Sequence, residues 1–170
     1  MSTVSDTRRA IIIFDSRYGN TEKISMALAK GIQESGFETF CKNINQVIPD
    51  SLSQYRLIAV GAPTEMITAS KSIKGFLDKI DKLDLHGSYG FAFDTKLPSR
   101  LSGSAAKYIE KKLKNTGLQM IISSSSAIVE SHKDAKQNVV LRDGEESRFE
   151  LIGREIGNML AAKIGKTVEP

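Results

Sequence analysis

Hydrophobic positions along the chain fall into short continuous runs that alternate with segments of helical spacing. Residues 11–14 are four large apolar residues in a row, which is typical of a strand buried on both faces of a parallel sheet. Between 24 and 32 the apolar residues recur every three or four positions, and this spacing predicts an amphipathic helix. Gly36 is placed to end that helix in the left-handed conformation.

The same alternation continues through the rest of the chain. Four further apolar runs predict strands, at 37–43, 56–63, 89–95 and 118–129. Three further apolar stripes predict helices, at 73–80, 105–113 and 152–164. Residues 45–54 have only a weak helical pattern, and 133–146 are predicted to form a long loop that contains the apolar trio 139–141. Five strands separated by helices predict an α/β fold, a doubly wound parallel sheet covered on both faces.

A polar segment, SRYGNT at 16–21, separates the first predicted strand from the first predicted helix. In a doubly wound sheet, ligands bind beyond the carboxyl ends of the strands, where this segment lies. The first turn of the helix has free backbone N–H groups, and no Glu or Gln stands where a capping box needs one. A bound phosphate would satisfy these donors, helped by the hydroxyls of Ser16 and Thr21, and Gly19 could take a positive φ. Alternatively, Asn20 or Thr21 caps the helix by itself and the turn binds nothing.

These motifs together resemble the flavodoxin family. The family's first loop reads roughly [Ser/Thr]-x-[Thr/Tyr]-Gly-[Asn/Gln]-Thr, usually followed by Glu, and SRYGNTE at 16–22 matches every position. GAPTEMITAS at 61–70 resembles its second loop, and DGEESRFELIGREIG at 143–157 resembles the element before its last helix. The resemblance covers residues 9–166 and implies a flavodoxin-like three-layer sandwich, with a five-stranded parallel sheet of order 2-1-3-4-5. Residues 1–8 are expected to be a flexible tail outside this domain.

The resemblance also implies a cofactor, FMN, with its phosphate on the first loop and its ring between the second loop and the loop after the fourth strand. The implied binding residues are Ser16, Arg17, Tyr18, Gly19, Asn20, Thr21, Pro63, Thr64, Glu65, Met66, Phe93, Asp94, Thr95 and Lys96. Lys96 either lies near the flavin ring or is a solvated loop charge. For Arg100 we expect a solvated loop charge. Asp94 either accepts a hydrogen bond from the ring or caps the loop. The sequence departs from the family in lacking the aromatic residues that often stack on the flavin, since Met66 and Phe93 stand there.

Composition narrows the remaining possibilities. The chain has 170 residues, 40% of them hydrophobic and 26% charged, and no apolar run approaches the roughly 18 residues that span a bilayer. A single cysteine, Cys41, excludes an internal disulfide and argues against a thiolate metal site, so we expect a cytoplasmic protein. The net charge of +4 contrasts with the strongly negative charge typical of soluble carriers of this family. The basic residues at 107–114 fit the wet face of a helix, so nucleic-acid binding is not expected.

Three functions remain open at this point. The first is electron transfer to a redox partner protein. The second is an FMN-dependent oxidoreductase that acts on a small acceptor such as a quinone or a porphyrinogen, which the basic charge and the missing aromatic stack favour. The third is a non-catalytic binding module without flavin. Whether the protein is an enzyme, and its oligomeric state, are left undecided by the residues.

Overall fold

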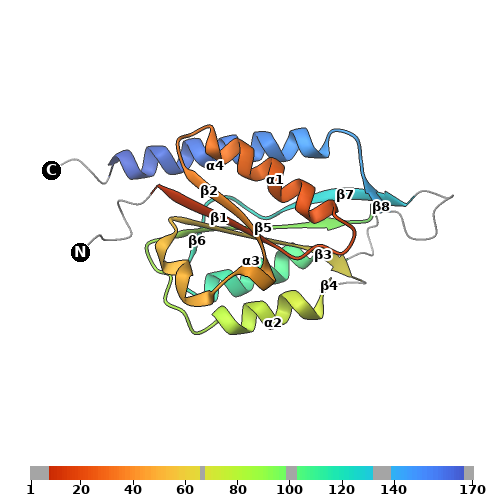
Figure 1. Cartoon of the computed structure of the whole chain (residues 1–170), viewed down its shortest axis with the longest axis horizontal. Helices are drawn as coiled ribbons and strands as arrows, with labels where there is room; N and C mark the ends of the chain where they lie inside the picture. Colours follow the sequence, from red (N-terminus) through yellow and green to blue (C-terminus); the bar gives the residue numbers. More distant parts are fainter. Residues whose placement is uncertain (1–7, 66–67, 99–102, 132–138, 167–170) are drawn as a thin grey trace.

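The computed structural model describes residues 8–65, 68–98, 103–131 and 139–166. A central sheet lies between two pairs of helices (Figure 1). Helices α1 (Asn20–Gln33) and α4 (Glu145–Lys166) cover one face of the sheet, and α2 (Lys71–Ile80) and α3 (Ala105–Asn115) cover the other. The proposed domain, 9–166, contains these elements, while the predicted tail lies almost wholly outside the described residues. No helix in the described ranges is long and apolar enough to cross a membrane.

The predicted order of the parallel strands, 2-1-3-4-5, is confirmed. Strand β1 (Arg9–Phe14) lies between β2 (Glu38–Asn43) and β3 (Leu57–Glu65), and β5 (Tyr89–Lys96) pairs with the other side of β3. All of these pairs are parallel, so the strands end at the same edge of the sheet. The buried residues of β1, β3 and β5 form two hydrophobic clusters, one beneath α2 and α3 and the other beneath α1 and α4.

The number of strands is larger than the five predicted. The fifth predicted strand is divided into β6 (Gln119–Met120) and β7 (Ser125–Ser131), both parallel to β5. Between them, the backbone N–H of Ser124 donates to the carboxylate of Glu110 on α3 at 3.2 Å rather than to a neighbouring strand. Two short antiparallel strands are added at the edge where the parallel strands end, β4 (Thr68–Ala69) against β3 and β8 (Val139–Leu141) against β7.

One segment with a weak helical pattern and one segment predicted as a loop both contain short regular elements. Residues 45–54 contribute to two short 3₁₀ helices, η2 (Ile44–Gln46) and η3 (Pro49–Gln54), instead of an α-helix. The apolar trio at 139–141 is strand β8 and not part of a loop, because it pairs with β7 at the end of the sheet. Together β7 and β8 form an antiparallel ribbon beside the carboxyl end of β5.

Helices α1 and α4 approach each other closely through glycine. A Cβ added at Gly31 of α1 would overlap the backbone oxygen of Glu150, and one added at Gly153 would overlap the backbone oxygen of Leu28. The absence of side chains at these two positions lets the helix backbones touch. The packing fixes α1, whose first residue, Asn20, follows the polar loop directly.

Candidate functional site

The polar loop between β1 and α1 turns sharply at Gly19. This residue has φ +87°, a conformation that glycine adopts without the steric cost of a Cβ. Its backbone N–H donates to Ser16 Oγ at 3.0 Å, and its carbonyl accepts from Lys23 N at 3.1 Å, which is the first bond of the helix. The prediction of a positive φ at Gly19 is therefore confirmed, and the loop is held by its own serine.

No side chain of the described residues caps the start of α1. The amide of Asn20 donates to the carbonyl oxygen of Val139 at 2.6 Å, and Thr21 Oγ1 lies 3.0 Å from Thr95 Oγ1 in a buried contact. Both side chains therefore fasten the loop to neighbouring strands instead of satisfying the helix donors. The alternative prediction from the sequence, that Asn20 or Thr21 caps the helix with its own side chain, is therefore wrong.

Helices α2 and α3, which also begin at this sheet edge, are capped. The hydroxyl of Ser70 accepts from Ile73 N at the start of α2, and that of Ser104 accepts from Lys107 N at the start of α3. Asp94 also accepts from the N–H of Ala106 at 3.0 Å. Helix α1 therefore differs from α2 and α3 in leaving the donors of its first turn without a side-chain partner.

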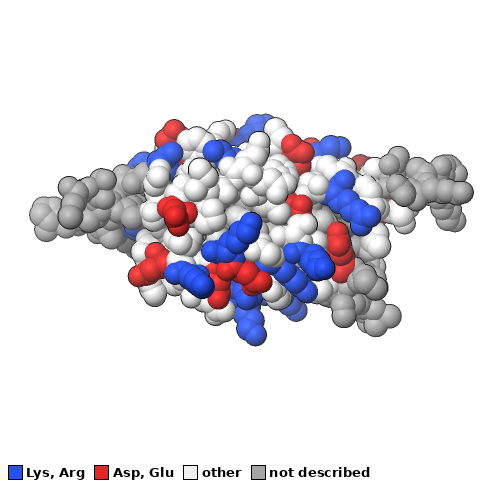
Figure 2. All heavy atoms as spheres, turned by 60° about the horizontal axis from the view of Figure 1, so that its bottom comes forward, with Lys and Arg blue, Asp and Glu red and all other residues white. Residues whose placement is uncertain are grey.

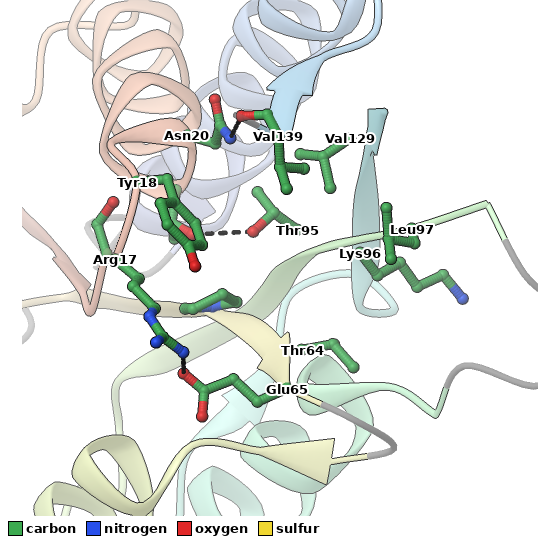
Figure 3. Close-up of a pocket in the computed structure, with 13 residues that line it drawn as sticks. Arg17, Tyr18, Asn20, Thr64, Glu65, Thr95, Lys96, Leu97, Val129 and Val139 are labelled. Carbon is green, nitrogen blue, oxygen red and sulfur yellow. Dashed lines mark hydrogen bonds and ion pairs between the residues drawn. The ribbon is translucent and has the colours of Figure 1, made fainter. Parts of the chain in front are cut away.

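A cavity of about 420 Å³ opens in front of this uncapped helix (Figure 3). The volume lies within the range usual for cofactor sites, roughly 300–1,000 Å³. Ten of the predicted site residues line it: Ser16, Arg17, Tyr18, Asn20, Thr21, Pro63, Thr64, Glu65, Thr95 and Lys96. The three loops that the sequence indicated therefore meet at one cavity.

Arg17 and Glu65 join two of these loops across the cavity. The Arg17 guanidinium lies 3.8 Å from the Glu65 carboxylate, and the two side chains are 64% and 41% exposed. The guanidinium also lies 5.4 Å from the centre of the Tyr18 ring, which is half exposed beside the cavity (Figure 3). Because such exposed pairs contribute about 0–1 kcal/mol, this ion pair can open at little cost.

Four of the predicted site residues do not line the cavity. Gly19 lies behind it in the turn, and Met66 lies outside the described residues. The ring of Phe93 is fully buried against Phe91 and fills the space above Gly61, so the expectation that it faces the cofactor is corrected. Asp94 is also fully buried and points to α3, which corrects its assignment to the cofactor and favours the cap that the sequence left open.

The sequence did not identify the apolar wall of the cavity. This wall consists of Val129 of β7, Val139 of β8 and Leu97, which follows β5. The two valines belong to the antiparallel ribbon, which was predicted only as the end of a strand and a loop. The available signal was two short apolar runs, 127–129 and 139–141, but only the pairing of β7 with β8 brings the two side chains together.

Other candidate residues lie away from the cavity. Cys41 is half-buried on β2, and burial raises the pKa of its thiol to about 11, so it is a poor nucleophile. Within the described ranges no cluster of His, Cys, Asp and Glu is arranged to hold a metal ion. The described residues that line the cavity therefore offer hydroxyl groups, charged side chains and an apolar wall.

A family model for flavodoxins matches residues 12–150. The chain belongs to the flavodoxin family. Flavodoxins bind FMN and transfer electrons through it, and the family assignment gives this chain the same cofactor and the same general function. The match includes the polar loop, the second loop and the ribbon that together line the cavity.

Curated relatives include both electron carriers and enzymes. The chain is 29% identical over 97 residues to a flavodoxin of Aquifex aeolicus, covering 56% of this chain and 50% of the other. It is 32% identical over 114 residues to an uncharacterized protein of Methanocaldococcus jannaschii, covering 66% and 71%. It is 28% identical over 114 residues to an NAD(P)H dehydrogenase (quinone) of Archaeoglobus fulgidus, covering 50% and 60%. The chain thus spans half to about seven-tenths of these relatives.

Solved structures agree on the fold. The oxidised flavodoxin 1 of Bacillus cereus superposes with a TM-score of 0.75 at 22% identity, covering 88% of this chain and 97% of the other. At that identity the likeness shows the fold alone. It confirms the flavodoxin-like arrangement of the sheet and its helices.

Proposed function

We propose that the cavity holds FMN, with the phosphate on the main-chain amides between Ser16 and Thr21, and that the protein exchanges electrons with a redox partner. The observation that carries this proposal is the uncapped start of α1. Its free N–H groups and the positive end of its dipole face the cavity, whereas α2 and α3 have side-chain caps. A phosphate dianion is the ligand that such a helix end favours.

The flavin ring would lie between the second loop and the loop after β5. Pro63 and Thr64 form one side of this space and Thr95 forms part of the other, while Val129 and Val139 supply an apolar surface. Tyr18 is the one aromatic side chain among the lining residues in the described part of the chain. The bound flavin supplies the redox chemistry, and these residues bind it, orient it and limit its contact with water.

A comparison of FMN with riboflavin tests the role of the polar loop. Riboflavin lacks the phosphate, so it loses at least two hydrogen bonds to a charged acceptor, each contributing about 1.5–3 kcal/mol. We therefore expect riboflavin to bind at least about a hundredfold more weakly than FMN in a calorimetric titration. Retention of the flavin absorbance bands after gel filtration would give independent support. Equal affinities for the two ligands would contradict the assignment of the phosphate to this loop.

A second candidate function is reduction of a small acceptor such as a quinone. It is favoured by the relatives named as NAD(P)H dehydrogenase (quinone) and by the mouth of the cavity, where Tyr18 and Leu97 are about half exposed. Turnover of NAD(P)H in the presence of a quinone by the purified FMN-loaded protein would support the enzyme. Absence of turnover, with rapid one-electron exchange, would support the carrier. The single cysteine supports a cytoplasmic location for either function.

A further inference from the structure

The two helix pairs differ strongly in charge. Helices α2 and α3 together contain seven lysines and two acidic residues, a net charge of +5, which exceeds the +4 of the whole chain. Helix α1 contains two lysines and one glutamate, and α4 has four basic and four acidic residues. Figure 2 shows the side of the molecule toward α2, where Lys and Arg side chains are numerous. The net positive charge of the four α-helices is therefore concentrated on α2 and α3.

The lysines of this face extend into the first turns of both helices. Lys71 is the first residue of α2 and Lys107 is the third of α3, and neither helix has an acidic residue in its first turn. By contrast, α1 has Glu22 and α4 has Glu145 and Glu146 in the first turn. A cation at the amino end of a helix opposes the helix dipole and lowers stability. The first turns of α2 and α3 therefore depart from the usual arrangement of charge, whereas those of α1 and α4 follow it.

These helix ends lie at the edge of the sheet where the cavity opens. Ser70, which precedes Lys71, donates to the Asp15 carboxylate at the end of β1 at 2.9 Å. The N–H of Ala105, two residues before Lys107, donates at 2.9 Å to Thr64 Oγ1, and Thr64 lines the cavity. The Asp15 carboxylate bonds Ser70 before α2, and the Asp94 carboxylate accepts from the Ala106 N–H of α3, so these two helix starts are already partnered. The exposed positive charge beside the proposed flavin site therefore comes from the two lysines.

The two lysines are exposed and make no ion pair with any residue the structure describes. Farther along the helices, Lys112 pairs with Asp78 at 3.2 Å and Lys114 pairs with Glu110 at 3.0 Å. The acidic residues of this face therefore neutralise charge away from the cavity. Lys71 and Lys107, at the ends of α2 and α3 nearest the cavity, are among the lysines whose charge no acidic residue of these helices neutralises.

We infer that this edge, defined by Lys71 and Lys107, docks an acidic one-electron carrier protein, whose carboxylates surround its own redox centre. The inference rests on the proposed electron-transfer function and names the partner's chemistry. In each encounter one electron passes between the partner and the bound flavin, so one is oxidised and the other reduced, and no atoms are exchanged. Complementary charge beside the flavin accelerates the encounter and orients the two centres.

A pair of double variants tests the inference. Lys71→Gln with Lys107→Gln removes two charges at the cavity, and Lys79→Gln with Lys82→Gln removes the same charge from the far end of α2 and the turn after it. Lys79 lies about 12 Å along the helix axis from Lys71, more than the Debye length of about 10 Å in 0.1 M salt. The probes are an acidic plant-type [2Fe–2S] ferredoxin, which in its reduced form donates one electron to the FMN-loaded protein, and the basic protein cytochrome c.

We expect the wild-type rate with ferredoxin to fall as salt rises, and the rate of cytochrome c reduction to rise. At low salt the first variant should react with ferredoxin roughly three- to tenfold more slowly, whereas the control should change less than about twofold. Binding of oxidised ferredoxin should weaken in parallel. The first variant should also have a higher melting temperature, because unfavourable cations have been removed from two helix ends.

Three results would overturn the inference. Equal effects of the two variants would show that the net charge of the protein, and not this edge, controls the encounter. A rate with ferredoxin that rises with salt, or a rate with cytochrome c that falls with salt, would show the wrong sign of charge at this edge. An equal slowing with a neutral quinone would show that the lysines act on the flavin and not on a partner. If the protein binds no FMN, the proposed function itself fails, which the binding titration shows separately.

Discussion

Replacement of Asp94 should loosen both loops that flank the proposed flavin ring. This buried carboxylate uses a single oxygen, Oδ2, to accept from the Thr64 hydroxyl at 2.9 Å, the Ser104 hydroxyl at 2.9 Å and the Ala106 N–H at 3.0 Å. Thr64 belongs to the end of β3, and the other two donors belong to the start of α3. One side chain therefore joins the two loops on either side of the cavity.

The cost of Asp94→Ala follows from these contacts. Each of the three bonds has a charged acceptor and contributes about 1.5–3 kcal/mol. The second oxygen, Oδ1, is buried without a partner among the described residues, so its removal relieves a desolvation penalty of about 1–3 kcal/mol. The difference between these two contributions is an expected net loss of about 2–8 kcal/mol in the free energy of unfolding. Asp94→Asn keeps an acceptor oxygen in place and should lose only about 1–2 kcal/mol.

The assay pairs urea unfolding of the apoprotein with titration of FMN. Ser88→Ala is the control, because Ser88 is also buried and donates to the Tyr55 carbonyl at 2.8 Å at the opposite end of β5. That variant should lose about 1 kcal/mol of stability with unchanged FMN affinity. Asp94→Ala should lose both stability and at least about tenfold in FMN affinity, because a loop must be ordered again on binding.

Two results would refute this reasoning. If Asp94→Ala unfolds within about 1 kcal/mol of wild type, the three hydrogen bonds do not hold the loops. If it loses stability but binds FMN as tightly as Ser88→Ala, the carboxylate supports the fold without positioning the cofactor loops. The Asp94→Asn variant should fall between the wild type and Asp94→Ala in both measurements.

Other predictions concern packing, pH and thiol reactivity. Gly31→Ala should lower the free energy of unfolding in urea by about 1–3 kcal/mol, because its Cβ would overlap the backbone of α4. Gly75→Ala, which has open space around it, should raise it by about 0.5–1 kcal/mol. Similar values for the two variants would contradict the close contact between α1 and α4. The Arg148 side chain lowers the pKa of Glu145, so its contribution to stability is present above the unfolded pKa of about 4.3 and is lost as pH falls through the folded pKa. Glu145→Gln should therefore lower stability at pH 7 far more than at pH 3. Cys41, with its pKa near 11, should react with iodoacetamide at pH 8 on the order of a hundredfold more slowly in the folded than in the urea-unfolded protein.

The parts of the fold that could be predicted depend on local signals. The run at 11–14 is apolar on both faces, and the helix after Gly19 has apolar residues on one side, so strand, turn and helix follow from neighbouring residues. Ten of the residues assigned to the cavity line it for the same reason, since the loops follow the carboxyl ends of parallel strands.

The orientation of Phe93 and Asp94 could not be predicted in this way. Side chains of a strand alternate between its two faces, so their directions depend on which face Thr95 takes. Thr95 contacts Thr21 on the α1 side, and alternation then turns Phe93 into the core beneath α1 and α4 and Asp94 toward α3. The missing information was a contact between residues 74 positions apart. The ribbon of β7 and β8 was missed for a similar reason, because its pairing is not local.

The alternation along β5 links the two halves of the proposed cofactor site. Thr95 is bound to Thr21 at the start of α1, where the phosphate would lie, and Asp94 is bound to Thr64 and Ser104, beside the space for the ring. Since these two residues are consecutive in one buried strand, the position of the phosphate loop is fixed relative to both ring loops. The distance between the phosphate loop and the ring loops is therefore set before a ligand binds. Because the loops need little further ordering, binding of a ligand that spans both places costs little conformational entropy. Neither Asp94 nor Thr95 of this strand caps α1. The backbone N–H groups of the first turn of α1 therefore stay free to bind a phosphate, although the loops around them are held in place.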